Sequence, residues 1–422
     1  MNEIVAMIEE MGRKARAASL KFASAPSEAK RSALRAMADA FDKASERLVA
    51  ENAKDVAQAK KEGLAPAMVE RLTLDAKRVA AMAKGVREVV ALPDPVGEVL
   101  REWTRPNGLR IRKVRVPRGV VGIIYESRPN VTADAGSLCL MSGNAAILRG
   151  GREALRSNAA LADLMEEAGR NAGLPDDCLQ LVRTPDREAV RALARLDRYI
   201  ACIVPRGGEG LIRAVVEGAT VPVVKHYKGV CHVFVDRAAD LAMARRIALN
   251  AKCQRPAVCN AMETLLVHRD AAAKFLPDVA KELFARGVEL HADTRAKAFV
   301  RAGGTVRDAL EEDWSTEYNA LVLNVKVVDS LDEAIAHINR YGSAHSDSIV
   351  TADAAAAERF LKEVDSATVY HNASTRFTDG GEFGMGAEIG ISTDRLHARG
   401  PMALEELTTY KYAILGNGQV RE

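Results

Sequence analysis

The sequence predicts an α/β protein built on parallel, doubly wound sheets. Short, continuous apolar runs alternate with helical patterns from residue 119 to residue 235, and the alternation restarts after Asp236. Buried strands separated by helices are typical of parallel sheets that are covered on both faces. A chain of 422 residues is long enough for two or three domains. We therefore expect two doubly wound α/β domains.

Residues 1 to about 90 are expected to form a helical layer. They are rich in Ala, Lys, Arg and Glu, and apolar residues recur at helical spacing in SALRAMADAFDKASERLVAENAKDVAQAKK. Pro66 and Pro93 interrupt this pattern and mark element ends.

A β-hairpin is predicted next, at residues 101–118. Asn107-Gly108 joins two short alternating runs there, and this dipeptide favours a tight hairpin turn. A two-stranded hairpin is marginally stable alone, so we expect it to dock on another element.

The elements of the two α/β domains follow from the same alternation. In the first, strands are predicted in GVVGIIYE, NAAILRGG, CLQLVR, YIACIVPRGG, TVPVV and HVFVD, and helices in TADAGSLCLMSG and REALRSNAALADLMEEAGRNAG. In the second, METLLVH predicts a strand, and helices are predicted in LAMARRIALNAKC, AAAKFLPDVAKELFARG and LDEAIAHINRYG.

Composition excludes several classes of partner. The net charge of +3 arises from 60 basic and 57 acidic residues mixed along the chain, and 5% of residues are aromatic, so a nucleic-acid partner is not expected. The N-terminal residues carry acids where a signal peptide is basic, and no window approaches 18 uninterrupted apolar residues. We expect a cytoplasmic protein without a membrane partner. Its six cysteines form no CxxC pair, which predicts reduced thiols.

Two Gly-Gly turns are candidate anion sites. LRGG at Leu148–Gly151 and PRGGEG at Pro205–Gly210 each follow a predicted strand and precede a helix. Ligands of open α/β sheets bind at such strand ends, where helix N-termini face anions, and Arg149 and Arg206 offer charge-assisted donors. The alternative is that each pair of glycines only turns the chain and each Arg lies in solvent.

A third candidate is Cys259, in KCQRPAVCNAMETLLV between a predicted helix and a predicted strand. A thiol at the start of the second domain suggests covalent catalysis. A cysteine is more often a small buried hydrophobe, however, and spacing alone does not select one of six.

Three long segments carry the most specific patterns of the chain: VPRGVVGIIYESRPNVTADAGSLCLMSGNAAILRGG, CQRPAVCNAMETLLVH and FGMGAEIGISTDRLHARGPMALEELTTYKY. All three resemble the aldehyde dehydrogenase superfamily. The similarity covers nearly the whole chain and implies an aldehyde dehydrogenase-like fold with a small β element. It is strongest to the branch that reduces the acyl phosphate L-glutamyl 5-phosphate to L-glutamate 5-semialdehyde, a step of proline biosynthesis.

The resemblance implies a nucleophile and a cofactor, NADPH or NADP+. Cys259 matches the nucleophile, and Glu317 falls where the superfamily has a glutamate that holds the nicotinamide ribose, with a helix-cap or surface role as the alternative. An Arg at position 149 is suited to a 2′-phosphate. The residues placed against the adenosine and pyrophosphate are Arg149, Gly150, Arg206, Gly207 and Gly208.

One departure from the superfamily bears on the reaction. Hydrolytic members carry a Glu that activates water, whereas this chain has Lys225 or His226 at that place. Release by inorganic phosphate needs an anion site and no such base. The resemblance therefore implies acyl phosphate chemistry, in which Lys225, His226 and Lys228 are candidates to bind phosphate, unless the lysines are simply exposed beside a turn.

The remaining site residues follow from what the reaction needs. Asn130 is the candidate side-chain amide for the oxyanion, beside the backbone NH of Cys259, and a helix cap is its alternative role. Ser127, Arg128 and Arg376 are candidates for the substrate α-carboxylate.

The resemblance also implies a role for each part of the chain. Residues 1–100 and 119–235 would bind the cofactor, residues 236–400 would carry the nucleophile, and the segments 101–118 and 401–422 would form an oligomerisation hairpin and tail. We expect a homodimer or homotetramer. The helical N-terminus is too short for a kinase domain, so the acyl phosphate would come from a separate glutamate 5-kinase.

Two other readings stay open. Four histidines, His226, His232, His371 and His397, would have to converge on zinc in a histidinol dehydrogenase-like enzyme, but none is paired at i, i+4, and we expect no metal. A non-catalytic binding protein with this fold is the third reading.

Overall fold

The computed structural model describes residues 3–300 and 303–421. The predicted segments 1–100, 236–400 and 401–422 include residues 1–2, 301–302 and 422, which lie outside the described part. The chain forms two compact units. Met1–Lys225, Gly384–Gly390 and Pro401–Glu422 make the first, and His226–Phe383 and Ile391–Gly400 make the second. The division falls between Lys225 and His226 rather than after residue 235.

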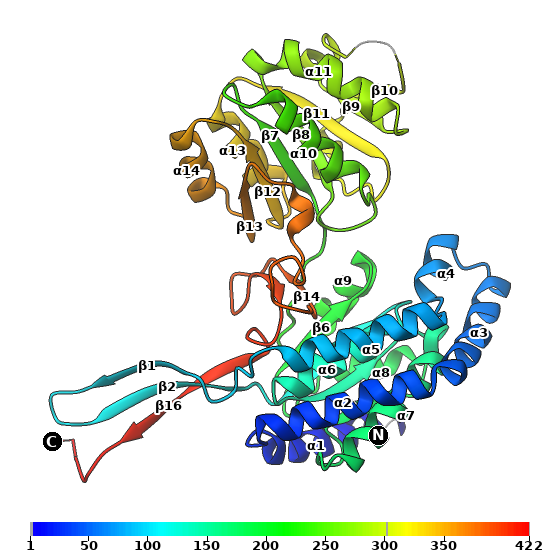
Figure 1. Ribbon diagram of the computed structural model, residues 1–422, viewed down its shortest axis with the longest axis vertical. Coiled ribbons are helices and arrows are strands. Elements are labelled where there is room, and N and C mark those ends of the chain that lie inside the picture. Colours follow the sequence, from blue (N-terminus) through cyan, green and yellow to red (C-terminus); the bar gives the residue numbers. More distant parts are fainter. Residues whose placement is uncertain (1–2, 301–302, 422) are drawn as a thin grey trace. The chain divides into compact units, whose positions relative to one another are not determined.

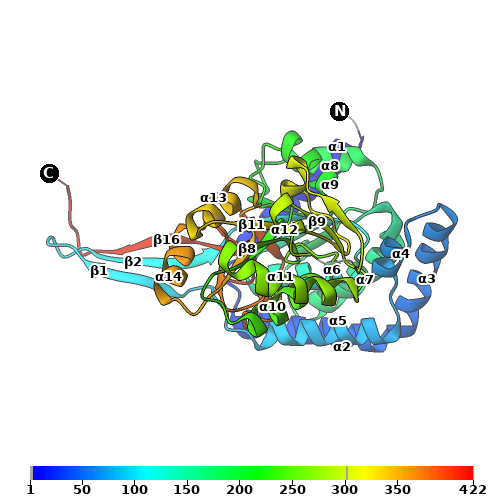
Figure 2. The same cartoon turned by 90° about the horizontal axis from the view of Figure 1, so that it is seen from above.

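A helical layer opens the first unit, as predicted. Pro66 is the first residue of α4, where its missing NH costs no hydrogen bond. Asp75 caps α5 by accepting a hydrogen bond from the NH of Arg78. Figures 1 and 2 show α2 and α5 lying side by side. The helices are α1 (Glu3–Phe22), α2 (Ser27–Lys43), α3 (Ser45–Lys61), α4 (Pro66–Leu72) and α5 (Ala76–Ala91).

The sheet of the first unit is parallel, with the order β5-β4-β3-β6. Its strands are β3 (Val120–Tyr125), β4 (Ala145–Arg149), β5 (Leu179–Leu181) and β6 (Cys202–Arg206). The connecting helices are α6 (Asn130–Met141), η1 (Arg152–Ala154), α7 (Leu155–Asn171), α8 (Arg187–Ala194) and α9 (Glu209–Gly218). Side chains of α1, α8 and α9 share one hydrophobic cluster with β3 and β4.

One predicted strand of this sheet is wrong. TVPVV forms only an isolated bridge between Val223 and Ile203. Pro222 has no NH to donate to a neighbouring strand, which explains why the ladder does not extend.

The hairpin is confirmed and docks on the tail of the same chain. Strand β1 (Val99–Thr104) pairs antiparallel with β2 (Arg110–Pro117), and Gly108 takes the positive φ of 87° that the turn requires. Strand β16 (Thr408–Leu415) pairs with the other side of β2, so three strands lie side by side as a ribbon (Figure 1). The role of this ribbon in oligomerisation stays a prediction.

The second unit carries a seven-stranded parallel sheet, with the order β10-β9-β11-β8-β7-β12-β13. The segment HVFVD, expected in the first domain, is β7 of this sheet because it pairs with β8 and β12. The strands are β7 (Cys231–Val235), β8 (Met262–His268), β9 (Glu289–Ala292), β10 (Val306–Asp308), β11 (Val322–Val328), β12 (Ser346–Val350) and β13 (Thr368–His371).

Helices cover both faces of this sheet. Val233 and Val235 of β7 pack in a cluster with α10 and α11, whereas Phe234 packs in another with α13 and α14. Alternate side chains of a strand point to opposite faces, so the helix pairs lie on opposite sides. The helices are α10 (Leu241–Cys253), α11 (Arg269–Phe284), α12 (Thr294–Lys297), η2 (Glu311–Ser315), α13 (Leu331–Tyr341), α14 (Ala354–Glu363) and η3 (Thr375–Phe377). A two-stranded sheet joins β14 (Gly390–Ser392) and β15 (Gly400–Met402).

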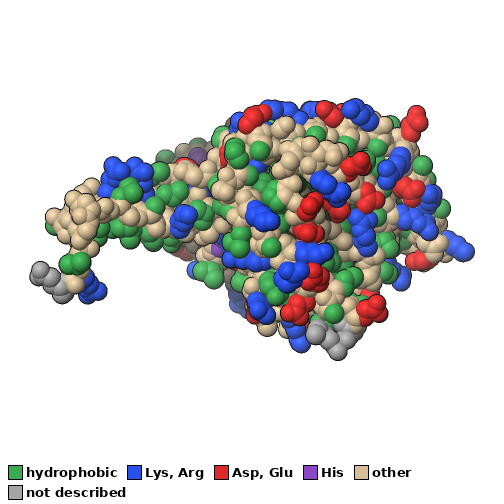
Figure 3. All heavy atoms as spheres, turned by 90° about the horizontal axis from the view of Figure 1, so that it is seen from below, with side chains coloured by type: hydrophobic (Ala, Val, Ile, Leu, Met, Phe, Trp, Pro, Cys, Tyr) green, Lys and Arg blue, Asp and Glu red, His purple; other side chains and the backbone are tan. Residues whose placement is uncertain are grey.

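Acidic and basic side chains are mixed on the surface, as they are along the sequence. Lys and Arg side chains alternate with Asp and Glu over much of the face drawn in Figure 3. Within the described residues, no helix combines the length and the apolar character needed to cross a lipid bilayer.

Candidate functional site

Cys259 lies on the loop between α10 and β8, and its backbone is tightly enclosed. The α-carbon of Gly229 approaches it so closely that a Cβ at 229 would overlap the carbonyl and α-carbon of Cys259. The thiol of Cys231, at the start of β7, donates a hydrogen bond to the carbonyl of Cys259 at 3.2 Å. Only glycine fits at position 229, and the two contacts fix the backbone of Cys259 from one side.

Glu317 contacts the same loop through Gly229. Its carboxylate accepts a hydrogen bond from the NH of Gly229 at 3.0 Å. Since Gly229 lies in a loop, the structure gives no support to the helix-cap alternative, and the side chain is half-buried rather than fully exposed. Glu317 therefore holds the segment that packs on Cys259, and its contact with a nicotinamide ribose stays a prediction.

Cys259 differs from most of the other cysteines in exposure. Four thiols are buried, at Cys139, Cys178, Cys202 and Cys231, whereas Cys253 and Cys259 are half-buried. Burial raises the pKa of the four buried thiols and of Cys253, which keeps them protonated. The thiolate is the reactive form of cysteine, so these five are poor nucleophiles.

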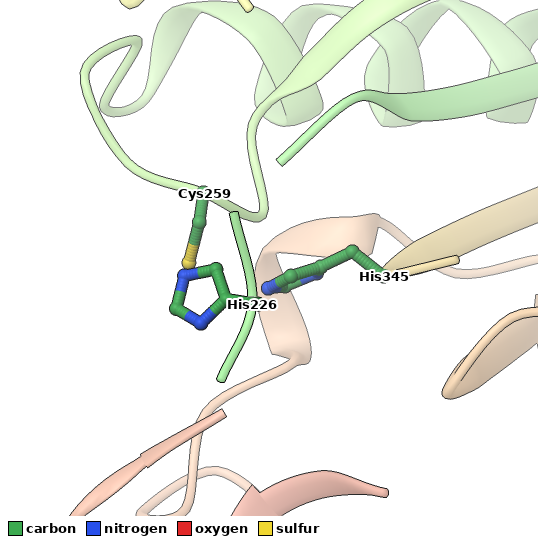
Figure 4. A group of neighbouring side chains, drawn as sticks. All are labelled: His226, Cys259 and His345. Carbon is green, nitrogen blue, oxygen red and sulfur yellow. The ribbon is translucent and has the colours of Figure 1, made fainter. Parts of the chain in front are cut away.

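Two histidines flank the thiol of Cys259 (Figure 4). The sulfur points toward the ring of His226, and the ring of His345 is directed to the same place. Donor atoms of the three side chains all lie within 4.8 Å of one another. The imidazole centroids are 5.6 Å apart, with the planes at 71°. The second unit thus brings a thiol and two imidazoles together.

Each imidazole is held by its other ring nitrogen. Nδ1 of His226 lies 2.8 Å from the carbonyl oxygen of Ile391. His345 is fully buried, and its Nδ1 lies 2.8 Å from Oγ of Ser346, which is 2.6 Å from Oγ1 of Thr378. These contacts orient the rings, with Nε2 facing away from the anchoring groups.

Arg376 and Asn260 complete the surroundings of the thiol. Nε of Arg376 donates to the side-chain oxygen of Gln254 at 2.7 Å. Burial and then the charge of Arg255 lower the pKa of Arg376, whereas the charge of Cys259 acts to raise it. Asn260 donates from its side chain to the carbonyl of Thr378 at 2.9 Å, which ties the loop after the nucleophile to this region. Arg376 and Asn260 are thus both tied to the loop that carries Cys259.

In the first unit, Arg149 is buried at the end of β4. The side chain is 7% exposed, so the alternative in which it lies in solvent is wrong. Its Nη2 donates to the carbonyls of Pro185 and Asp186 at 2.9 and 3.3 Å. Nε of Arg149 and Nδ2 of Asn158 are buried without an acceptor among the described residues. A Cβ at Gly150 would overlap the Asn158 amide, so the glycine brings the turn against these donors.

The second Gly-Gly turn starts α9. Gly208 is its N-cap residue, and the NH of Gly208 donates to Oε2 of Glu126 at 3.2 Å. Burial raises the pKa of Glu126, and the bond from Gly208 opposes this shift. Arg206 is half-buried and Gly207 is exposed. The helix N-terminus therefore already binds a carboxylate oxygen, as expected for an anion site.

Asn130 does not cap α6. Pro129 is the N-cap residue, and no side chain caps this helix, so the capping alternative is wrong. The amide of Asn130 instead donates to Oδ2 of Asp134 at 2.9 Å. Burial raises the pKa of Asp134 to about 6, although the Asn130 bond acts to lower it. A role of Asn130 in oxyanion binding stays a prediction.

The other candidate substrate residues are partly enclosed. Ser127 is 3% exposed and has a positive φ of 45°, and both its NH and its hydroxyl bind Oε1 of Glu153, at 2.6 and 2.9 Å. Arg128, Lys225 and Lys228 are half-buried, so the two lysines are not simply exposed side chains beside a turn.

The four histidines of the zinc alternative do not converge. His232 binds Asp347 at 2.7 Å and His371 lies 2.9 Å from the carbonyl of Thr351. Across residues 3–300 and 303–421, the group of potential metal ligands is His226, Cys259 and His345. The histidinol dehydrogenase-like arrangement is therefore wrong.

Sequence reasoning missed four residues around Cys259: Gly229, Cys231, Asn260 and His345. Two of them could have been named from the sequence, because Asn260 directly follows the nucleophile and Gly229 directly follows the Lys225–Lys228 segment. His345 gave no signal, because it is brought to the thiol by the pairing of β7 with β12 rather than by spacing.

Comparisons with known proteins agree with these observations. The family model described as the aldehyde dehydrogenase family matches residues 4–302 and 305–412. A gamma-glutamyl phosphate reductase of Carboxydothermus hydrogenoformans is 57% identical over 411 residues, which cover 97% of this chain and 98% of the relative. One of Caldanaerobacter subterraneus subsp. tengcongensis is 53% identical over 415 residues, with 98% and 100% covered.

A solved structure extends the agreement to the fold. The crystal structure of gamma-glutamyl phosphate reductase from Thermotoga maritima is 46% identical, with a TM-score of 0.96, and the match covers 98% of this chain and 100% of that one. The fold and the resemblance inferred from three sequence segments are both confirmed. The chain therefore belongs to the aldehyde dehydrogenase family, and within it to the gamma-glutamyl phosphate reductases.

Proposed function

We propose that this protein reduces L-glutamyl 5-phosphate to L-glutamate 5-semialdehyde with NADPH, through a thioester on Cys259. The observation that carries the proposal is the half-buried thiol of Cys259, whose backbone is fixed by Gly229 and Cys231 and whose sulfur faces two oriented imidazoles. The names of the close relatives support the substrate.

In the first step, the thiolate of Cys259 attacks the γ-carbonyl carbon of the acyl phosphate. A sulfur–carbon bond forms, the bond from carbon to the bridging oxygen breaks, and phosphate leaves with the electron pair and takes up a proton. Covalent catalysis divides one difficult reduction into two easier steps. Half-buried Lys225 and Lys228 are suited to hold the departing phosphate, and Arg376 is suited to the substrate α-carboxylate.

NADPH, which Arg149, Arg206, Gly207 and Gly208 would hold, would supply the hydride that reduces the thioester carbon. The sulfur–carbon bond of the resulting thiohemiacetal then breaks, which releases the aldehyde and restores the thiolate of Cys259. The oxyanion that develops on the former carbonyl is stabilised by the backbone NH of Cys259, and removing one such donor costs about 3 kcal/mol. No residue is needed to activate water, since the acceptor in the reverse direction is phosphate.

The residues of the first unit fit a dinucleotide with phosphates. Gly208 already donates its NH to a carboxylate oxygen, and a Cβ at Gly208 or Gly210 would meet no atom within 4 Å among the described residues, apart from its chain neighbours and, for Gly210, the backbone of its own helix. Two buried donors, Arg149 Nε and Asn158 Nδ2, have no acceptor within the described part of the chain and lie beside Gly150. Arg206, Gly207 and Gly208 would hold the pyrophosphate, and Arg149 would hold the 2′-phosphate that distinguishes NADPH from NADH.

The partners follow from the same chemistry. The substrate is a labile acyl phosphate, which a separate glutamate 5-kinase would supply in the cytoplasm. The protein would form a homodimer or homotetramer through the edges of the β1-β2-β16 ribbon, because β16 exposes Tyr410, Tyr412 and Ile414.

The experiment is an assay of the reverse reaction, NADP+ reduction with L-glutamate 5-semialdehyde, at increasing phosphate concentration. We expect activity that requires phosphate, disappears in Cys259→Ala and survives in Cys253→Ala, whose thiol is also half-buried. Activity without phosphate would refute the acyl phosphate route. Activity retained by Cys259→Ala would refute the nucleophile.

A further inference from the structure

We propose that His226, Cys259 and His345 form a binding site for Zn²⁺, and that the ion inhibits the enzyme by occupying the nucleophile. The inhibition rests on the proposed function, because it follows only if Cys259 is the nucleophile, whereas the binding does not. The three side chains come from separate segments of the second unit and point to one place (Figure 4).

The donor set suits zinc. Cysteine sulfur and imidazole nitrogen are the preferred ligands of Zn²⁺, and three protein ligands leave a fourth position for water. Donor atoms of a tetrahedral site with these ligands are about 3.3 to 3.6 Å apart. Here they lie within 4.8 Å of one another, so side-chain shifts of about an ångström would close the site.

The outer contacts also suit a metal site. Metal-binding imidazoles are usually held through the second ring nitrogen by a carbonyl or another polar group. His226 has the Ile391 carbonyl in this position and His345 has the Ser346 hydroxyl, which Thr378 holds in turn. Each ring is thus oriented through its Nδ1, and ligand atoms of the three side chains come within 4.8 Å of one another.

Binding is a ligand exchange with no redox change. The ion loses waters, a sulfur–zinc bond forms, and the proton of the Cys259 thiol passes to the solvent. A sulfur bonded to zinc cannot attack an acyl phosphate, so the cation competes with the substrate rather than assisting it.

Cobalt provides a direct probe, because thiolate-to-Co²⁺ charge transfer gives an absorption band that needs no substrate or activity. The protein, freed of metals with a chelator, is titrated with Co²⁺ and then with Zn²⁺. We expect a near-ultraviolet band that Zn²⁺ removes, that is absent from Cys259→Ala, and that is unchanged in Cys253→Ser. Loss of a group that only orients a ligand weakens metal binding by about 10- to 100-fold. Loss of a ligand should cost at least as much, so we expect His226→Ala and His345→Gln each to weaken binding about tenfold or more.

His345→Gln keeps a polar group at a buried position, and thermal melting shows whether the variant folds. If it does not, the His226→Ala titration decides in its place. No charge-transfer band in a folded wild-type protein, a band that persists in Cys259→Ala, or equal binding in a folded histidine variant would each overturn the site. A band from a protein without reductase activity would separate failure of the proposed function from failure of this inference.

Discussion

Gly229→Ala should impair the reaction far more than it impairs folding. A Cβ at this position would lie closer than 3.0 Å to the carbonyl oxygen, carbonyl carbon and α-carbon of Cys259, a distance that real Cβ atoms essentially never show. Because the obstacle is backbone, the Cys259 loop must move by on the order of an ångström. A misplacement of 1 Å near the reacting atoms can cost about 10²-fold in rate.

The assay compares kcat for phosphate-dependent NADP+ reduction with the free energy of unfolding in urea. We expect kcat to fall about 100-fold, while overpacking lowers the unfolding free energy by about 1–3 kcal/mol. Gly218→Ala is the matched control, since a Cβ there would meet no atom of the described chain within 4 Å beyond its neighbours and the backbone of its own helix. A Gly229→Ala enzyme with wild-type kcat would refute the view that this glycine positions the nucleophile.

Three further predictions follow from buried and charged groups. Lys252 and Glu263 form a fully buried ion pair at 2.6 Å. Lys252→Met leaves the carboxylate unpaired and should lower the free energy of unfolding in urea by about 3–5 kcal/mol, whereas the double variant Lys252→Met/Glu263→Leu should recover most of this loss. Equal losses in the single and the double variant would contradict this prediction. Burial, and then the charge of His232, lowers the pKa of His337 to about 2. As the pH falls, the unfolded chain therefore binds this proton before the folded protein does, and the free energy of unfolding decreases below about pH 6.5. In His337→Phe, the urea midpoint should decrease less between pH 7.5 and pH 4.5 than in the wild type. Equal decreases in the two proteins would contradict this prediction. Glu126→Gln removes a negative charge at the N-terminus of α9. The free energy of NADPH binding should become about 1 kcal/mol more favourable, which is roughly fivefold tighter binding in a fluorescence titration. Weaker binding would show that the phosphates lie elsewhere.

Much of the fold was predictable because local patterns and tertiary structure agree. The Asn107-Gly108 turn, the N-terminal helical layer and the strands that end in LRGG and PRGG all appear where periodicity and turn residues placed them. The exceptions have physical causes. TVPVV lacks a donor at Pro222, and HVFVD was placed in the wrong sheet because strand pairing is a long-range property that a single apolar run does not encode.

The site was predictable only in part. Cys259 emerged from family resemblance, since its local sequence does not distinguish it from five other cysteines. The surroundings of the thiol depend on tertiary contacts: Gly229 is set by its approach to the Cys259 backbone, and His345 by its place before β12. Hydrogen-bond partners could not be predicted from the sequence either. The amide of Asn130, for example, binds Asp134 instead of capping α6.

The central claim is the thioester on Cys259, and trapping it tests that claim most directly. Protein is mixed with L-glutamate 5-semialdehyde and NADP+ in the absence of phosphate, and NADPH formation and the intact mass are followed together. A thioester route predicts a burst of one NADPH per active site, one glutamyl group on the peptide that contains Cys259, and release of this group on addition of phosphate. Steady turnover without phosphate, or an adduct on a different residue, would contradict it.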